Sequence, residues 1–247
     1  GPVSVATLKP RLEQLFRNWQ PGEIPAKRID EVRAQPDRIL YLVDKPGAEQ
    51  SVIFAGQLIP PRATADDIAI EAMNDVLGGQ FTARLNMNLR EDKHWSYGAY
   101  SMAQDARGQR ALLAYAAVQS DKTAESLKEI RNEIKDIATT RPASADEVAL
   151  VKRSNILSLP GQWETGAAVL GSISKLVEFG LPDTYWAGYA DAVRSLTPEQ
   201  VNQAARDHLQ PEGLVFVVVG DRKVIEPGLK ALGFDAIQLV DTDGELL

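Results

Sequence analysis

The order of the predicted elements places this chain in the α+β class, with a mainly antiparallel sheet and helices segregated on one face. Three observations predict it: strand patterns occur in clusters, amphipathic helix patterns follow in a long run, and an apolar strand returns near the C-terminus. Regular alternation of strands with helices, which is typical of a parallel sheet, does not occur. With 247 residues, 44% of them hydrophobic, the chain can bury a substantial core.

The N-terminal part is predicted to contain one helix and two strands. Apolar side chains at helical spacing predict a helix over residues 5–19, which a Pro-Gly pair ends. Residues 38–43 and 50–58 are rich in strand-forming side chains. The turn signal at residues 44–47 predicts that these strands form a hairpin.

The next elements surround the glycine block, which runs from Gly78 to Tyr97 and begins with two glycines. Thr64 is the expected cap of a helix whose apolar stripe ends at Gly78-Gly79, and a short second helix is expected to end at Arg90. Strands are then predicted over 96–104 and 110–119, where the glycine in the connecting loop suits a hairpin.

Helices dominate the remainder of the chain. Apolar positions spaced 3, 4 and 3 residues apart predict an amphipathic helix over 121–141. Capping boxes begin two more helices, at Ser144 with Glu147 and at Thr197 with Gln200. The other expected elements are helices over 165–179 and 183–194, a strand over 214–219, a helix to about residue 232 and a strand over 237–240.

Composition excludes several classes of function. A net charge of -7 without runs of Lys or Arg argues against nucleic-acid partners and against binding to an anionic membrane. The longest apolar run, residues 214–219, is too short for membrane insertion. The absence of cysteine removes thiolate chemistry, and His94 and His208 have no second ligand at helical spacing. We therefore expect neither a metal site nor a cofactor site in this chain.

Arg90 and Tyr97 are the candidate site residues. Each has an ordinary structural explanation, because a cation suits the C-terminal end of a helix and tyrosine is common in half-buried strands. Together, seven residues apart across a helix-loop-strand junction, they could present the N–H donors of a guanidinium and one O–H to the same ligand. A peptide carbonyl, or the oxyanion that it becomes on hydrolysis, would accept such bonds.

Six segments in order carry a resemblance that covers most of the chain: residues 78–85, 89–91, 96–97, 181–186, 196–201 and 217–221. They resemble the second domain of the pitrilysin or insulinase group of zinc metallopeptidases, which includes mitochondrial processing peptidase. The resemblance implies one unit of a duplicated architecture, in which paired α+β domains close around an extended peptide. Zinc is held in the first domain by an inverted His-x-x-Glu-His helix and a downstream Glu.

This sequence lacks the inverted zinc motif and therefore resembles the metal-free, C-terminal domain. The resemblance implies that Arg90 and Tyr97 contact the substrate backbone and stabilise the oxyanion, and that the peptide adds as a strand to a sheet edge. Zinc is then expected in a partner domain or subunit of the same family, without which this domain is inactive. The alternative is a non-catalytic scaffold or interaction subunit. His94-Trp95 departs from the family's more usual Gly-Leu pair, so Trp95 is expected to alter the pocket, while His94 is expected to be a surface loop histidine.

The resemblance and one internal repeat predict the division into domains. Residues 1–16 are similar to the stretch after Gly220, which has the same kind of apolar spacing. We therefore expect 1–20 to be the terminal helix of a preceding domain, 21–36 a linker, and 37–247 the C-terminal, non-zinc-binding peptidase-like domain. No targeting signal is evident, and a periplasmic location is compatible with the resemblance.

Overall fold

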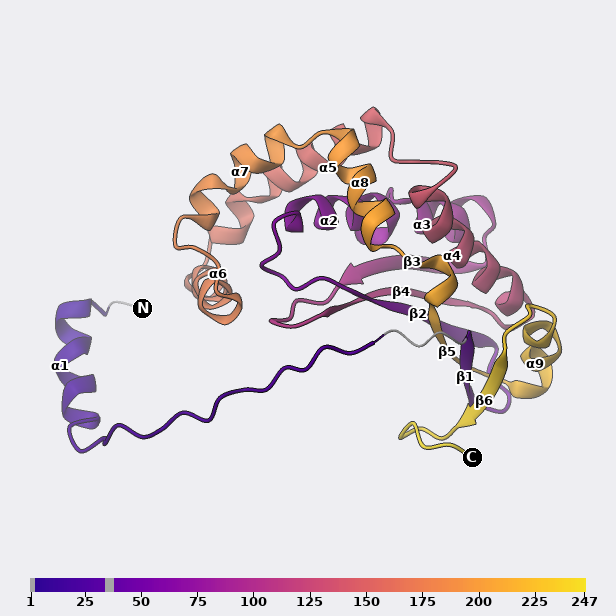
Figure 1. The fold of residues 1–247 in the computed structure, drawn as a ribbon, viewed down its shortest axis with the longest axis horizontal. Helices are drawn as coiled ribbons and strands as arrows, with labels where there is room; N and C mark the ends of the chain where they lie inside the picture. The colour runs from indigo at the N-terminus through magenta and orange to yellow at the C-terminus, as the bar shows by residue number, and fades with distance from the viewer. Residues whose placement is uncertain (1–2, 34–37) are drawn as a thin grey trace. The chain divides into compact units, whose positions relative to one another are not determined.

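The computed structural model describes residues 3–33 and 38–247 (Figure 1). The chain divides after Asp30 into two compact units. Residues 34–36 of the predicted linker, residue 37 at the predicted domain start, and residues 1–2 lie outside the described residues.

The first unit contains helix α1 (Val5–Leu15). Ser4 and Thr7 form a capping box at its start. The helix ends at Leu15, four residues before the predicted end at residue 19, and Phe16 is its C-cap. The side chains of α1 are exposed, and a helix end without tertiary packing is only marginally stable. The described linker residues 21–33 contain neither helix nor strand.

The second unit contains a six-stranded sheet and confirms the α+β class. Its strands are β1 (Ile39–Asp44), β2 (Gln50–Ile59), β3 (Ser96–Ala103), β4 (Arg110–Gln119), β5 (Val215–Gly220) and β6 (Ala236–Val240). They lie in the order β3-β4-β2-β5-β1-β6. The predicted β3-β4 hairpin is present, β2 is antiparallel to β4 and β5, and β1 is parallel to β5 and β6. The sheet is therefore mixed, with its antiparallel part at the β3 end.

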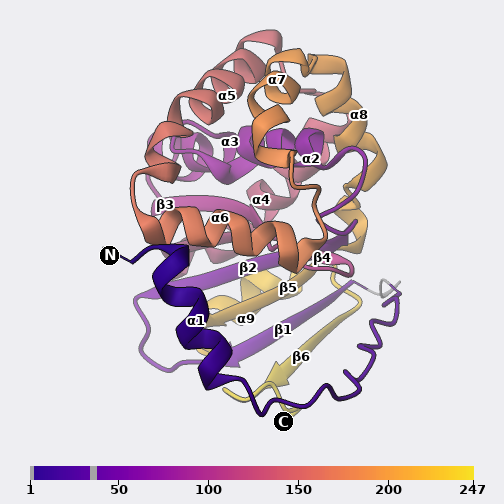
Figure 2. The same ribbon diagram turned by 90° about the vertical axis from the view of Figure 1, so that its left-hand side faces the viewer.

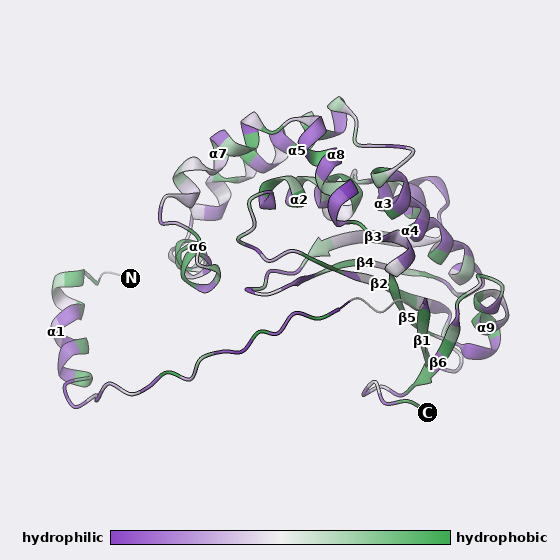
Figure 3. Ribbon diagram, in the orientation of Figure 1, coloured by the Kyte–Doolittle hydropathy of each residue, from purple (hydrophilic) through white to green (hydrophobic). Residues whose placement is uncertain are grey.

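The predicted hairpin of β1 and β2 is wrong. Strand β5 lies between them, so that Phe54 of β2 faces Val217, and Val217 faces Tyr41 of β1. Figure 2 shows β5 between its two neighbours, and Figure 3 shows that β1, β5 and β6 are all hydrophobic. An apolar strand gains most from a central place in a sheet, and the turn at residues 44–47 only reverses the chain.

Helices cover one face of the sheet (Figure 1). They include α2 (Asp67–Asn74), α3 (Arg84–Asn86), α4 (Thr123–Ala138), α5 (Ala145–Ser158), α7 (Tyr185–Ser195) and α8 (Pro198–His208). Helices α6 (Gly166–Phe179) and α9 (Arg222–Lys230) complete the unit. Alternate residues of β4 are buried beneath the helices, while Phe54, Tyr100 and Met102 remain exposed on other strands.

Local signals predicted most of these helices correctly. Both capping boxes form, at Ser144 with Glu147 and at Thr197 with Gln200. The apolar stripe of α4 is buried, namely Leu127, Ile130, Ile134 and Ile137. Thr64 is not a cap, because α2 follows Asp66, whose side chain makes no capping bond.

Gly78 and Gly79 lie so close to neighbouring atoms that a Cβ would not fit at either position. After α2 the chain widens into a π-helical segment, η1 (Asp75–Gly79). A Cβ at Gly78 would lie 2.4 Å from the backbone nitrogen of Ser101, and one at Gly79 would lie 2.4 Å from a carboxylate oxygen of Asp75. Gly78 therefore permits η1 to pack directly against β3, the strand that carries Tyr97.

Candidate functional site

The junction between the second helix and β3 carries both candidate residues. Helix α3 continues as a π-helical segment, η2 (Met87–Asp92), so the helical path extends two residues beyond the predicted end at Arg90. His94 then adopts a left-handed conformation with φ of 58°. The Trp95 N–H donates to the Leu89 carbonyl at 2.9 Å, which closes the turn into β3.

An irregularity in β3 places Tyr97 at the site. Ser96 pairs with Val118 and Ala99 with Ala116, so two residues of β3 face the single Ala117. This two-against-one arrangement is a β-bulge, a feature that redirects side chains and is frequent beside active sites. The Ser96 hydroxyl lies 2.7 Å from the Ala117 carbonyl and accepts the Gly98 N–H at 3.1 Å. Tyr97 consequently projects from the strand and is 88% exposed.

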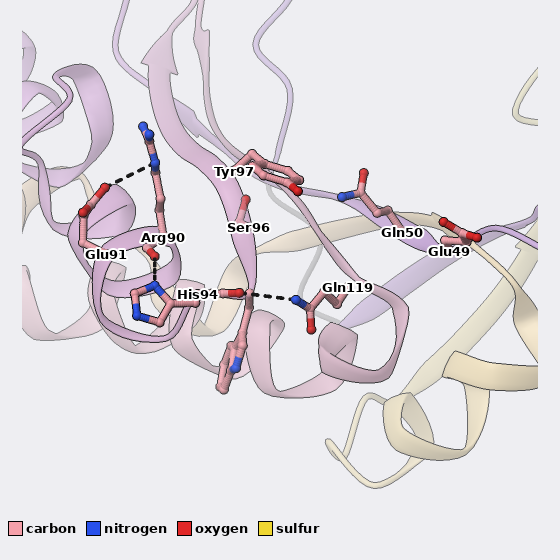
Figure 4. Close-up of a pocket in the computed structure, with 9 residues that line it drawn as sticks. Glu49, Gln50, Arg90, Glu91, His94, Ser96, Tyr97 and Gln119 are labelled. Atoms are coloured by element: carbon pink, nitrogen blue, oxygen red, sulfur yellow. Dashed lines mark hydrogen bonds and ion pairs between the residues drawn. The ribbon is translucent and has the colours of Figure 1, made fainter.

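Arg90 and Tyr97 line one cavity of about 520 Å³ (Figure 4). Other parts of its wall come from the start of β2 and the end of β4, where Gln50 pairs with Gln119. The full lining is Glu49, Gln50, Arg90, Glu91, His94, Trp95, Ser96, Tyr97 and Gln119. The structure therefore brings the two predicted residues to one concave surface, together with Trp95.

The guanidinium of Arg90 is held on two sides and open on the third. Its Nε lies 3.2 Å from Oε1 of Glu91, and its Cζ lies 4.8 Å from the centre of the Phe81 ring. Within residues 3–33 and 38–247, no hydrogen bond involves Nη1 or Nη2 of Arg90 or the hydroxyl of Tyr97. These N–H and O–H groups are the donors that the cavity offers to a ligand.

The two histidines have different surroundings. His94 lines the cavity, and its Nδ1 lies 3.0 Å from the Arg90 carbonyl. His208 bonds the Asp66 carboxylate through Nε2, and its carbonyl accepts the Gln57 side-chain N–H at 2.6 Å. His208 thus joins α8 to β2 and to the start of α2, away from the cavity.

Among the described residues, no group of three or more His, Asp or Glu side chains is arranged to hold a metal ion. The helices of the same residues include none with the length and apolarity needed to cross a membrane.

A comparison with protein families identifies the fold. The family model described as the peptidase M16 inactive domain matches residues 1–155, which is more than half of the chain. The chain belongs to this family. The predicted resemblance to the metal-free domain of zinc metallopeptidases is thereby confirmed.

Solved structures share the fold of this M16 domain at low sequence identity. A peptidase M16 inactive domain from Pseudomonas fluorescens is 23% identical with a TM-score of 0.76, and the match covers 89% of this chain and 52% of that one. A protease from Helicobacter pylori is 17% identical with a TM-score of 0.77, covering 89% and 53%. The inactive peptidase domain of a putative zinc protease from Bordetella parapertussis is 14% identical with a TM-score of 0.61, covering 70% and 93%.

This M16 chain spans about half the length of the first two structures that it matches. A search among curated proteins gave no match.

Some residues of the M16 cavity could not be identified as site residues from the sequence. Glu49, Gln50 and Gln119 reach it only through the pairing of β2 with β4. Phe81 lies inside the glycine block, but only the fold brings its ring to the Arg90 guanidinium. One feature of the sequence could have indicated the left-handed backbone of His94: the family more often has glycine in this loop, and glycine readily adopts that conformation.

Proposed function

We propose that this domain binds a peptide substrate and helps to stabilise the oxyanion formed during hydrolysis by a zinc-dependent metalloendopeptidase. The observation that carries this proposal is the single cavity lined by Arg90 and Tyr97. Among the described residues, the Nη groups of Arg90 and the hydroxyl of Tyr97 make no hydrogen bond. Membership of the M16 inactive-domain family supports the same role.

The chemistry divides between this domain and a partner. Zinc in a partner domain or subunit would polarise the scissile carbonyl and activate a water molecule. The residues of this chain would contribute hydrogen bonds to the peptide and to the negative charge that develops on the carbonyl oxygen. Removal of one such preorganised donor costs up to about 4 kcal/mol of transition-state stabilisation.

An extended peptide is the substrate class that this geometry suits best. Strand β3 lies at one edge of the sheet, where main-chain groups can pair with an added strand. The Ala99 N–H is already bonded to the Asn86 side chain at 3.2 Å. An added peptide would therefore have to pair elsewhere along the edge that leads to Tyr97.

The first prediction tests the two donors in the assembled peptidase. Arg90→Ala and Tyr97→Phe should each lower turnover by roughly ten- to a thousandfold, because each removes donors to the oxyanion. Hydrolysis of a fluorogenic peptide measures the effect. The matched controls are Arg206→Ala and Tyr41→Phe, which change side chains outside the cavity and away from the β3 edge.

Wild-type turnover in both site variants would reject the proposal and leave the non-catalytic scaffold as the function. A drop shared by the control variants would indicate general damage to the fold.

We also infer the arrangement of the parent protein. Residues 1–20 would end a preceding domain, 21–36 would be a linker, and the zinc-bearing partner would be that domain or a separate subunit. Two related structures support this arrangement, because the match covers only about half of each of their chains. Adding a metal-bearing M16 domain to this chain and measuring peptide hydrolysis before and after zinc removal tests it.

A further inference from the structure

His94 has an unusual backbone conformation beside the cavity. Among the described residues other than glycine, it alone has a positive φ, of 58°. It follows Lys93 at the end of η2, a position at which glycine commonly adopts this conformation. An L-residue pays a steric cost there because its Cβ approaches the following carbonyl. Such strain persists where the surroundings impose it, and it is frequent at functional sites.

The imidazole of His94 holds the main chain of Arg90. Its Nδ1 lies 3.0 Å from the Arg90 carbonyl oxygen (Figure 4). Because a carbonyl only accepts hydrogen bonds, Nδ1 carries the proton and donates. The His94 carbonyl in turn accepts the Gln119 side-chain N–H at 3.3 Å. Through these two bonds His94 connects Arg90 in η2 with Gln119 at the end of β4. Gln119 forms another part of the cavity wall.

The side chain of Arg90 has its own two contacts. The Phe81 ring lies under the guanidinium at 4.8 Å, and Glu91 engages Nε at 3.2 Å. Arg90 lies inside η2, two residues before the end of that segment. The bond from His94 to the Arg90 carbonyl is a further contact on this main chain, and His94 also forms the turn that leads to Tyr97.

We propose that His94 is a positioning residue, which holds the Arg90 main chain and thereby keeps Arg90 in the lining of the cavity that Tyr97 also lines. This inference rests on the proposed function of Arg90. Glycine would adopt the same turn without the steric cost, but it would have no ring to bond the Arg90 carbonyl. The imidazole therefore stabilises the placement of the guanidinium at the expense of backbone strain.

The test compares His94→Gly with His94→Asn in the assembled peptidase. His94→Gly keeps the turn and removes the hydrogen bond, so kcat should fall about tenfold with little change in KM. His94→Asn tolerates the left-handed conformation and can donate from its amide, so kcat should stay within about threefold of wild type. The Tm of His94→Gly should stay within about 4 °C of wild type, because relief of strain offsets the lost bond.

A second readout needs no partner. In this chain alone, the Nε–H signal of Arg90 in a ¹⁵N NMR spectrum should be resolved from those of exposed arginines. His94→Gly should move it toward the average of exposed arginines, and His94→Asn should leave it near its wild-type position. An unchanged signal in His94→Gly overturns the positioning role whatever the activity.

Measuring Arg90→Ala in parallel separates the two proposals. If Arg90→Ala is slow while His94→Gly has wild-type kcat, only the positioning role fails. Wild-type turnover of Arg90→Ala rejects the proposed function, and the NMR signal then decides the role of His94. A loss of activity in His94→Gly that follows a fall in Tm of more than about 8 °C also overturns positioning, because the residue would then serve the fold.

Discussion

Arg84 and Arg90 lie six residues apart in the glycine block, but one side chain is buried in ion pairs and the other is partly exposed at the cavity. Arg84 has a side chain only 7% exposed, and its Nε and Nη2 bond Glu147 at 2.7 and 2.8 Å. Its remaining donors reach the carbonyls of Arg141 and Pro142. The side chain of Arg90 is 40% exposed, and the shortest distance in its ion pair with Glu91 is 3.2 Å, from Nε.

The difference shows what each guanidinium contributes. Arg84 joins α3 to the start of α5, where Glu147 also completes the capping box with Ser144. Burial alone would raise the pKa of Glu147, but hydrogen bonds from Arg84 and from the Ser144 main chain outweigh it and lower the pKa to about 2. Arg84 therefore stabilises the fold, whereas Arg90 keeps its terminal donors available at the cavity.

The largest expected effect on stability comes from Arg84→Met. This change removes the Arg84 donors of the partly buried Glu147 carboxylate and of two carbonyls, so unfolding free energy should fall by about 3–5 kcal/mol. Thermal unfolding should show a Tm lower by roughly 6–20 °C. A loss of unfolding free energy below about 1 kcal/mol would contradict the claim that Arg84 stabilises the fold.

A smaller effect of opposite sign is expected at Asp75, the first residue of η1, for which residues 3–33 and 38–247 provide no ion pair. Burial raises the pKa of Asp75 to about 6, although a hydrogen bond from Asn155 opposes the shift. Since this value exceeds the unfolded pKa of about 4, the folded state binds more protons between these values, and stability falls as pH rises from about 4 to 6.

Asp75→Asn should remove this pH dependence and raise stability at pH 7 by roughly 1–2 kcal/mol. Urea unfolding at pH 4.5 and pH 7 measures the change, and Asp183→Asn, at an exposed carboxylate, is the control. Equal stability of Asp75→Asn and wild type at pH 7 would contradict the prediction.

The smallest effect on stability is expected at the site itself. Arg90→Ala and Tyr97→Phe should change unfolding free energy by less than about 0.5 kcal/mol. Tyr97 is largely exposed, and the ion pair of the partly exposed Arg90 side chain with Glu91 contributes little. Their Tm values should stay within about 2 °C of wild type. If Arg90→Ala lowered the unfolding free energy by about 2 kcal/mol, Arg90 would be a structural residue like Arg84, and the two arginines would no longer differ in role.

Local patterns were sufficient for elements whose signals lie within a few residues. The capping boxes at Ser144 and Thr197 and the buried stripe of α4 follow from contacts three or four residues apart. The hairpin of β3 and β4 follows from a short loop between neighbouring strands. The predicted end of α1 was less accurate, because the helix ends at Leu15 and not at residue 19.

The site was predictable only in part. Arg90 and Tyr97 are close in sequence, so a junction between two elements was enough to suggest them. Their contrast with Arg84 was not predictable, because Glu147 is distant along the chain and meets Arg84 only after α5 has packed. The left-handed His94 and the Phe81 ring under Arg90 likewise depend on how η1, η2 and β3 fit together.

The sequence by itself determined the α+β class, most helix boundaries and the family, because these depend on short-range periodicity, capping and ordered motifs. Tertiary structure alone decided that β5 separates β1 from β2 and that Gln50 and Gln119 complete the wall beside Tyr97. The reason is physical: strand pairing is set by competition among apolar strands for central positions, and that competition joins residues distant in the chain. The same long-range packing decides which arginine is buried in ion pairs and which remains open to a ligand.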